Sequence, residues 1–177
     1  PSRIDCVVGI TKAYTTRVGS GPFPTEQDDA AGKHLRDVGV EFGSVTGRPR
    51  RTGWLDLPAL RYARRGNGLD GLALTKLDVL TGLDRVRICV AYDTPAGRVD
   101  ELPIDLIDRP GLATPVYRDF DGWTEPLSGA RRLDDLPPAA RRYLDFLESG
   151  AEVPLYLVSV GPRRAETIEL RHPFAGN

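Results

Sequence analysis

Blocks of apolar and polar residues alternate along the chain, and they predict strands and helices in turn. Residues 4–18 are rich in Val, Ile, Thr and Tyr, which favours a strand, and a loop rich in Gly and Pro follows at 19–24. A helix is expected next, with Thr25 and Asp28 as a possible capping pair. The apolar face of this helix and the glycine that ends it are Ala31, Leu35, Val38 and Gly39.

A second helix is predicted after a polar loop at 43–53. Asp56 can cap this helix, Pro58 suits its first turn, and Gly66 can end it. The side chains expected to face inward from it are Leu57, Leu60 and Ala63.

Two short apolar runs further along the chain predict buried strands, at 72–75 and 86–92. A turn at 95–97 follows the second run, because it contains Pro and Gly. The stretch 103–135 shows no clear periodicity, so no element is assigned to it.

The last part of the chain predicts a helix and two strands. The helix opens at Pro137 or Pro138 and closes at Gly150, and its apolar face consists of Ala140, Tyr143, Leu144 and Leu147. Strands are expected at 153–159 and 167–170. Helices that alternate with short apolar strands predict an α/β fold, with a mostly parallel sheet and flanking helices.

Composition favours a globular protein and excludes several classes of function. The 177 residues are 40% hydrophobic and contain neither a repeat nor a low-complexity linker, so one α/β region over 1–177 is expected. Net charge is −1, which gives no bulk attraction to nucleic acid or to a membrane surface. No stretch is long and apolar enough to span a bilayer, and no leader is visible, so a cytoplasmic protein is expected. Cys6 and Cys89 lie in apolar runs and are interpreted as buried, reduced thiols.

The loop FGSVTGRPRRTGW, at 42–54, has a composition that suits anion binding. Backbone amides near Gly43 and Gly47 can approach a carboxylate or phosphate closely, since glycine has no Cβ. Three arginines in the same loop, Arg48, Arg50 and Arg51, supply planar donor forks. A solvated basic loop would have the same composition, so this reading stays open.

Two further loops follow predicted strands, where α/β proteins bind ligands. Lys76 and Asp78 follow the strand at 72–75, and the Asp78 carboxylate could accept hydrogen bonds from a guanine edge while the Lys76 stem lies against the base. Ser159 begins the second loop, which continues to Gly161 and could contact another edge of a base. A solvated strand end and an ordinary turn remain the alternatives.

The usual catalytic motifs are absent from the sequence. There is no phosphate-cradling GxxxxGK[ST] loop, no pair of histidines at metal spacing, and no Ser or Cys with an evident base partner. His34 is predicted to lie in a helix and His172 in a polar tail, and both are interpreted as structural or solvated. The segment from Lys12 to Gly19 carries two cations and two hydroxyls, which suit a structural role as well as a binding role.

Five ordered blocks resemble the C-terminal part of adenylosuccinate synthetase: KAYTTRVGSGPFPTE, EFGSVTGRPRRTGWLDLPALRYA, LALTKLDVL, RICVAYD and LVSVGPRR. The resemblance covers nearly the whole chain. It implies the C-terminal portion of a P-loop-NTPase-like synthetase fold. It also implies a role in the GTP-dependent ligation of IMP and L-aspartate to adenylosuccinate, a step of AMP biosynthesis, with Mg²⁺ as cofactor.

The same resemblance implies which residues contact the substrates. Contacts to aspartate and IMP are implied for Val18, Gly19, Ser44, Val45, Thr46, Gly47 and Arg48. Contacts to GTP are implied for Arg50, Lys76, Leu77, Asp78, Ser159, Val160 and Gly161. Thr46 and Arg48 would receive the carboxylates of aspartate, and Arg48 would also reach IMP.

Several parts of the family pattern have no counterpart in this sequence. The Gly-rich phosphate loop, the catalytic aspartate and the catalytic histidine are missing, so no catalytic residue is assigned and the Mg²⁺ ligands are expected elsewhere in a longer protein. Pro49 in the basic loop and Arg163, where the family often has an acidic residue, are smaller departures. A homodimer is expected for the whole enzyme. The alternative is a guanine-nucleotide-binding fragment without catalysis, whereas a nucleic-acid binder is disfavoured by the net charge.

Overall fold

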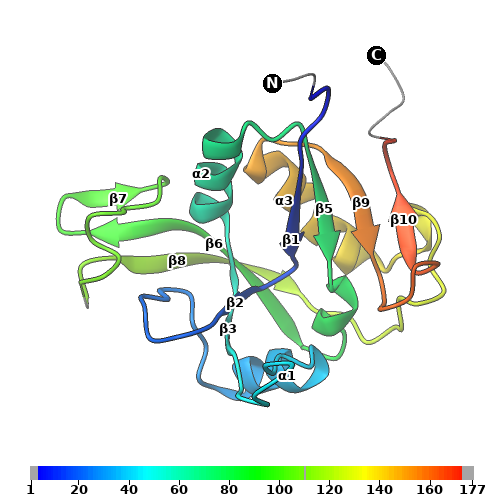
Figure 1. Ribbon diagram of the computed structural model, residues 1–177, viewed down its shortest axis with the longest axis horizontal. Coiled ribbons are helices and arrows are strands. Elements are labelled where there is room, and N and C mark those ends of the chain that lie inside the picture. Colours follow the sequence, from blue (N-terminus) through cyan, green and yellow to red (C-terminus); the bar gives the residue numbers. More distant parts are fainter. Residues whose placement is uncertain (1–3, 110, 173–177) are drawn as a thin grey trace.

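A computed structural model describes residues 4–109 and 111–172. Its main sheet has the strand order β1-β5-β9-β10, seen at the centre and right of Figure 1. The strands of this sheet are β1 (Val8–Lys12), β5 (Gly71–Thr75), β9 (Leu155–Ser159) and β10 (Thr167–Glu169). The first three are parallel and β10 is antiparallel to β9, so the expected parallel sheet is confirmed for its three-stranded core.

Two smaller sheets lie beside the main one (Figure 1). The first contains β4 (Leu55–Asp56), β6 (Arg85–Thr94), β7 (Gly97–Val99) and β8 (Thr114–Asp121). The second pairs β2 (Thr15–Arg17) with β3 (Arg51–Gly53). Only β4 and β6 are parallel in these sheets, and β6 is antiparallel to β7 and β8, so the mostly parallel arrangement does not extend to them.

The helices are α1 (Ala30–Val38), α2 (Leu57–Asn67) and α3 (Pro138–Ala151), with short 3-10 turns η1 (Leu77–Leu80) and η2 (Leu133–Asp135). α2 connects β4 to β5, and α3 leads into β9, while α1 lies beyond the carboxyl ends of β1 and β5 (Figure 1). Leu74 and Leu147 are fully buried between sheet and helix. Phe120 of β8 meets Tyr143 of α3 edge to face, which joins the smaller sheet to the same core.

Several predicted boundaries are wrong, each for a local reason. The strand expected at 4–18 is interrupted at Ala13 and Tyr14, two buried residues that lie between β1 and β2. The N-cap of α1 is Asp29, which accepts the Gly32 N–H, and not the pair Thr25 and Asp28.

The other differences lie at element ends and in the stretch that showed no periodicity. α2 runs on past Gly66 to Asn67 because Gly68 adopts the left-handed cap conformation, at φ 59°. α3 likewise extends to Ala151. The stretch 103–135, left unassigned from sequence, contains β8.

The burial predicted for both thiols is confirmed for Cys89 and is wrong for Cys6. Cys6 and Cys89 form no disulfide; Cys89 is buried and Cys6 is half-buried. Burial raises the pKa of the Cys89 thiol to about 12, so this side chain is an inert part of the core. No helix among the described residues has the length and hydropathy needed to cross a membrane.

Asp56 should be important for stability because its carboxylate accepts hydrogen bonds from both α2 and β6. One carboxylate oxygen accepts the Ala59 N–H at the start of α2, and the other accepts the hydroxyl of buried Tyr92. Replacing Asp56 with Ala removes the cap and leaves the Tyr92 hydroxyl unpaired, which should cost about 2 kcal/mol. Asp56→Asn retains a capping oxygen and an amide for Tyr92, so it should cost clearly less. Urea unfolding of both variants checks this, and equal losses would contradict it.

Candidate functional site

Three neighbouring parallel strands end at one edge of the main sheet, and each leads into a polar segment. β1 ends at Lys12, β5 leads into Lys76–Asp78, and β9 leads into Ser159–Gly161. The side chain of Thr75 donates to the carbonyl of Thr11 at 3.1 Å, which ties the first two strand ends together. The carboxyl edge of parallel strands is the usual ligand side of an α/β sheet.

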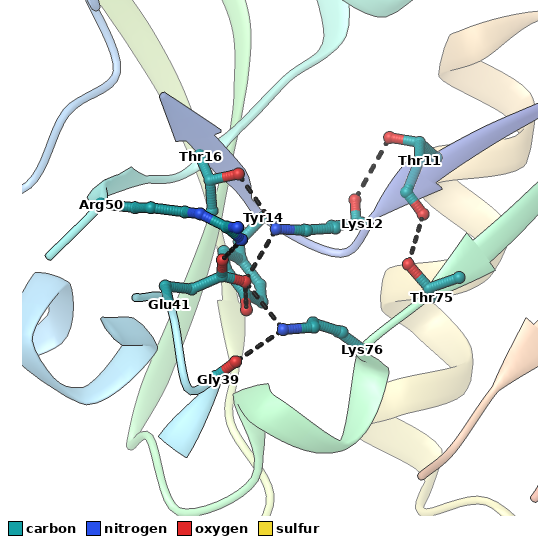
Figure 2. A network of polar contacts seen from close by, with 9 residues as sticks. All are labelled: Thr11, Lys12, Tyr14, Thr16, Gly39, Glu41, Arg50, Thr75 and Lys76. Carbon is teal, nitrogen blue, oxygen red and sulfur yellow. Dashed lines mark hydrogen bonds and ion pairs between the residues drawn. The ribbon is translucent and has the colours of Figure 1, made fainter. Parts of the chain in front are cut away.

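A buried carboxylate organises this edge. Glu41 is 0% exposed, and Oε1 accepts hydrogen bonds from Lys12 Nζ at 2.8 Å, Lys76 Nζ at 2.9 Å and the Tyr14 hydroxyl at 2.6 Å. Its other oxygen accepts from Arg50 Nη1 at 2.9 Å. Figure 2 shows these side chains converging on Glu41 from separate segments; we call Lys12, Tyr14, Glu41, Arg50 and Lys76 the Glu41 cluster.

The Glu41 cluster contains more positive than negative charge. Burial raises the pKa of the Glu41 carboxyl, but hydrogen bonds from Lys12, Tyr14, Lys76 and Arg50 outweigh burial and lower this pKa to about 2. Three cations therefore face one ionised carboxylate. The cations are each about one-third exposed, with side-chain values of 27% for Lys12, 34% for Arg50 and 35% for Lys76, so they reach solvent while Glu41 does not.

Stability should fall in acid through Glu41. The folded pKa of about 2 lies below the ordinary glutamate value of 4.5, so Glu41 stabilises the fold above about pH 4.5 and loses this contribution as pH falls towards 2. The contribution is at most about 3 kcal/mol. Urea unfolding between pH 2 and 7 should show a steeper pH dependence for the wild type than for Glu41→Gln. Other ionised carboxylates, such as Glu26, contribute to both curves, so parallel curves would contradict the prediction.

A polar cleft of about 660 Å³ lies beside the Glu41 cluster. It is lined by residues of the 17–20 loop and of the 43–51 loop: Arg17, Val18, Gly19, Ser20, Gly43, Thr46, Arg48, Pro49, Arg50 and Arg51. The fold therefore brings Val18 and Gly19, expected at the aspartate and IMP site, together with Thr46 and Arg48 of the same expected site. Arg50, which was expected to contact GTP, lines the same cleft. Ser44, Val45 and Gly47 lie on the exposed side of the same loop and do not line the cleft.

The three arginines of the basic loop have different surroundings. Arg51 pairs with both oxygens of Glu26, through Nε at 2.7 Å and Nη2 at 2.5 Å. Arg50 pairs with Glu41. Arg48 is exposed, and its guanidinium has no carboxylate partner within residues 4–109 and 111–172. The expectation that all three arginines are available to bind an anion is therefore wrong. Arg51 is paired with Glu26 and Arg50 with Glu41, which leaves Arg48 as the arginine of this loop without a carboxylate partner in the part of the chain that the structure describes.

The 76–78 segment begins with an unusual backbone. Lys76 has φ 60° and ψ 33°, so its chain turns sharply out of β5 into η1. Its ammonium donates to the Gly39 carbonyl at 2.6 Å as well as to Glu41, which leaves its aliphatic stem as the part able to contact a ligand. Leu77 is fully buried, whereas Asp78 is half-buried, and burial raises the pKa of the Asp78 carboxyl.

The 159–161 loop lies next to this segment, because β9 pairs with β5 and packs against η1. The Ser159 hydroxyl donates to the Gly161 carbonyl at 2.8 Å, and the amide of buried Val160 donates to the Glu166 carbonyl at 2.8 Å. The charge of Glu166 reaches Asp78 strongly enough to contribute to its raised pKa. The two segments assigned to one base therefore adjoin, as the sequence analysis expected for a shared site.

Sequence reasoning missed Glu41. It precedes the basic loop in a polar stretch, and nothing in its spacing distinguishes it from a solvated glutamate. His34, by contrast, lies in α1 as predicted, and its Nε2 is 2.9 Å from the Val79 carbonyl.

Fold and site together define a mixed α/β protein whose polar cleft and strand-end loops occupy the usual ligand side of the sheet. A family model for adenylosuccinate synthetase matches residues 1–168. The chain belongs to the adenylosuccinate synthetase family.

Named relatives agree with this family. The adenylosuccinate synthetase of Sorangium cellulosum is 59% identical over 175 residues, which cover 99% of this chain and 40% of that protein. That of Moorella thermoacetica is 55% identical over 174 residues, covering 98% and 40%. A structure described as fully ligated adenylosuccinate synthetase from Plasmodium falciparum superposes with a TM-score of 0.89 at 39% identity, covering 95% of this chain and 40% of that one. The chain thus spans about 40% of the length of these relatives.

Proposed function

We propose that this chain is the substrate-recognition part of an adenylosuccinate synthetase, a ligase that joins IMP to L-aspartate with GTP. The 43–50 loop would hold aspartate and IMP, with Thr46 and Arg48 at the carboxylates and Val18 and Gly19 on the facing loop. Lys76–Asp78 and Ser159–Gly161 would hold guanine. The uncommitted Arg48 guanidinium at a polar cleft is the observation that carries the first assignment.

Charge supports an anionic substrate at the cleft. Arg17, Arg48 and Arg50 line it, and among the residues named for its lining none is acidic. An arginine fork binds a carboxylate or phosphate in bidentate fashion, which fixes the orientation of the anion as well as its position. A dicarboxylic amino acid and a nucleotide monophosphate are both anions of this kind.

Guanine recognition is supported at the other end of the site. A half-buried carboxylate such as Asp78 can accept both N1–H and the exocyclic amine of guanine, whereas adenine presents no such pair of donors. The raised pKa of Asp78 indicates that burial disfavours its charge, so a ligand that supplies two donors would be favoured there. Hydroxyl and amide groups of the 159–161 loop would serve another edge of the base.

This chain would bind and orient the substrates. Among the described residues, no three His, Cys, Asp or Glu side chains come together as possible metal ligands. Mg²⁺ would neutralise charge on the GTP phosphates during phosphoryl transfer, and its ligands stay predicted for a part of the synthetase other than this chain. The homodimer and the cytoplasmic location also stay predictions for the whole enzyme.

A nucleotide-binding fragment without catalysis is the second candidate, because no catalytic residue is assigned within this sequence. Both candidates share the guanine site, so calorimetric titration of the 177-residue chain with GTP and with ATP is the primary test. We expect saturable GTP binding and at least about tenfold weaker ATP binding. Equal binding of GTP and ATP would contradict guanine recognition. Formation of adenylosuccinate from IMP, aspartate and GTP then separates the ligase from the fragment.

A further inference from the structure

Three side chains from segments that are far apart in the sequence converge on the carboxylate of Glu41. Lys12 comes from the end of β1, Arg50 from the residue before β3, and Lys76 from the residue before η1 (Figure 2). Oε1 accepts from both lysines and Oε2 accepts from Arg50. Arg50 and Lys76 thus share one fully buried carboxylate, although β3, β4, α2 and β5 lie between them in the chain.

The backbone of Glu41 also forms the base of the 43–50 loop. Its carbonyl accepts the Arg50 N–H at 2.9 Å, and one step further in, the Gly43 N–H donates to the Arg48 carbonyl at 2.8 Å. The Gly47 N–H then donates to the Gly43 carbonyl at 2.8 Å. Glu41 therefore holds Arg50, at the end of the loop, through both its backbone carbonyl and its side chain, so a displacement of the Glu41 side chain should also disturb the loop.

The donors around Glu41 compete for few acceptor sites. Oε1 receives two ammonium groups and the Tyr14 hydroxyl, while three cations surround one negative charge. Removal of one cation leaves part of the buried negative charge without a donor, so the carboxylate shifts and its contact with Arg50 weakens. In a closely packed, fully buried position such rearrangements involve discrete shifts of several side chains rather than one.

We propose that Glu41 is a positioning residue that couples the order of the 43–50 loop to the position of Lys76. The biological meaning of this coupling rests on the proposed function, in which the loop holds aspartate and the Lys76 stem lies against guanine. Seating a base on that stem would then help to close the loop that binds the second substrate. The coupling itself is a property of the free chain and can be measured without any ligand.

Amide hydrogen exchange on the 177-residue chain tests the coupling. Lys76→Met removes one charge and keeps the aliphatic stem, and it should speed exchange of the Gly43, Gly47 and Arg50 amides at least roughly threefold. Lys33→Met is the matched control, because it removes an equal charge from an exposed pair on α1 with Asp37. Unchanged loop exchange in Lys76→Met would overturn the proposal.

A double-mutant cycle separates coupling from general loosening of the fold. In a Glu41→Gln background, Lys76→Met should produce no further acceleration of loop exchange, since the connecting carboxylate is gone. Additive effects would overturn the proposal. Should Glu41→Gln fail to fold by circular dichroism, the cycle is run between Lys76→Met and Arg50→Met, whose side chains are partly exposed. Non-additive loop exchange is again the expected result and additivity the contrary one.

GTP titration of the same variants distinguishes failure of the coupling from failure of the proposed function. Selective GTP binding together with additive exchange effects would remove the role of Glu41 and leave the guanine site standing. Non-additive exchange without GTP binding would keep the coupling and remove the nucleotide assignment. If both hold, GTP should slow exchange of the 43–50 amides in the wild type and not in Glu41→Gln.

Discussion

Asp78→Asn should lower the affinity of the chain for GTP at least about 100-fold, while leaving its weak affinity for ATP unchanged. The carboxylate would accept two hydrogen bonds from guanine, each a charge-assisted contact of about 1.5–3 kcal/mol. An asparagine offers one acceptor and turns its amide donor towards a donor on the base, so one contact is lost and a repulsive one replaces it. Calorimetric titration with both nucleotides measures the effect.

ITP provides a second measurement on the same residue. Inosine lacks the exocyclic amine of guanine, so the wild type should bind ITP more weakly than GTP, and Asp78→Asn should narrow that difference. Asp145→Asn is a suitable control, since it makes the same chemical change at an exposed position on α3. Equal loss of GTP affinity in the two variants, or a preserved preference for GTP over ITP in Asp78→Asn, would contradict recognition by Asp78.

Glu41→Ala should be the most damaging single change to stability among the charged residues, at about 4 kcal/mol. Removal of one partner from a buried, hydrogen-bonded ion cluster leaves the others without compensation, and here Tyr14 also loses the acceptor of its buried hydroxyl. For a chain of this length such a loss should lower the melting temperature by roughly 8–16 °C. Differential scanning calorimetry measures it.

An exposed ion pair supplies the control for Glu41→Ala. Glu101 pairs with Arg65 at the surface, where side-chain exposures are 63% and 46%, so Glu101→Ala should cost less than about 1 kcal/mol. Similar losses in the two variants would show that the Glu41 cluster contributes no more than an ordinary surface contact. Glu41→Gln should fall between them, because its amide oxygen can still accept from one cation.

The sequence predicted the elements whose signals are local. Asp56, Pro58 and the apolar spacing around Leu60 define α2 from capping, ring geometry and periodicity, and the structure confirms that start. The predicted end of α2 at Gly66 is one residue too early. Gly66 and Gly68 are equally suitable helix-ending residues in the sequence, and only the three-dimensional structure distinguishes them. β8 was missed altogether, since its residues are mostly half-buried or exposed and show no clean alternation.

The residues of the site, like the elements of the fold, could be predicted where the signal is local in the sequence and were missed where it depends on distant contacts. Composition and position after a strand were enough to select Arg48 and the 76–78 segment, and the family resemblance ordered them into substrate contacts. Composition alone could not separate Arg48 from Arg51, because the partner of Arg51 is Glu26, 25 residues away. Glu41 was invisible for the same reason: its importance arises from side chains of β1, the 43–50 loop and the 76–78 segment that meet only in three dimensions.

The left-handed backbone at Lys76 places two unrelated demands on a single position. The conformation disfavours β-branched side chains and would be relaxed by Gly or Asn, whereas Glu41 and Gly39 require an ammonium at the end of a long stem. A mutational library at this position, sorted first for folding and then for nucleotide affinity, would therefore yield two different consensus residues. The contacts of the Lys76 ammonium with Glu41 and Gly39 thus offset the cost of its left-handed backbone, which a glycine at this position would avoid.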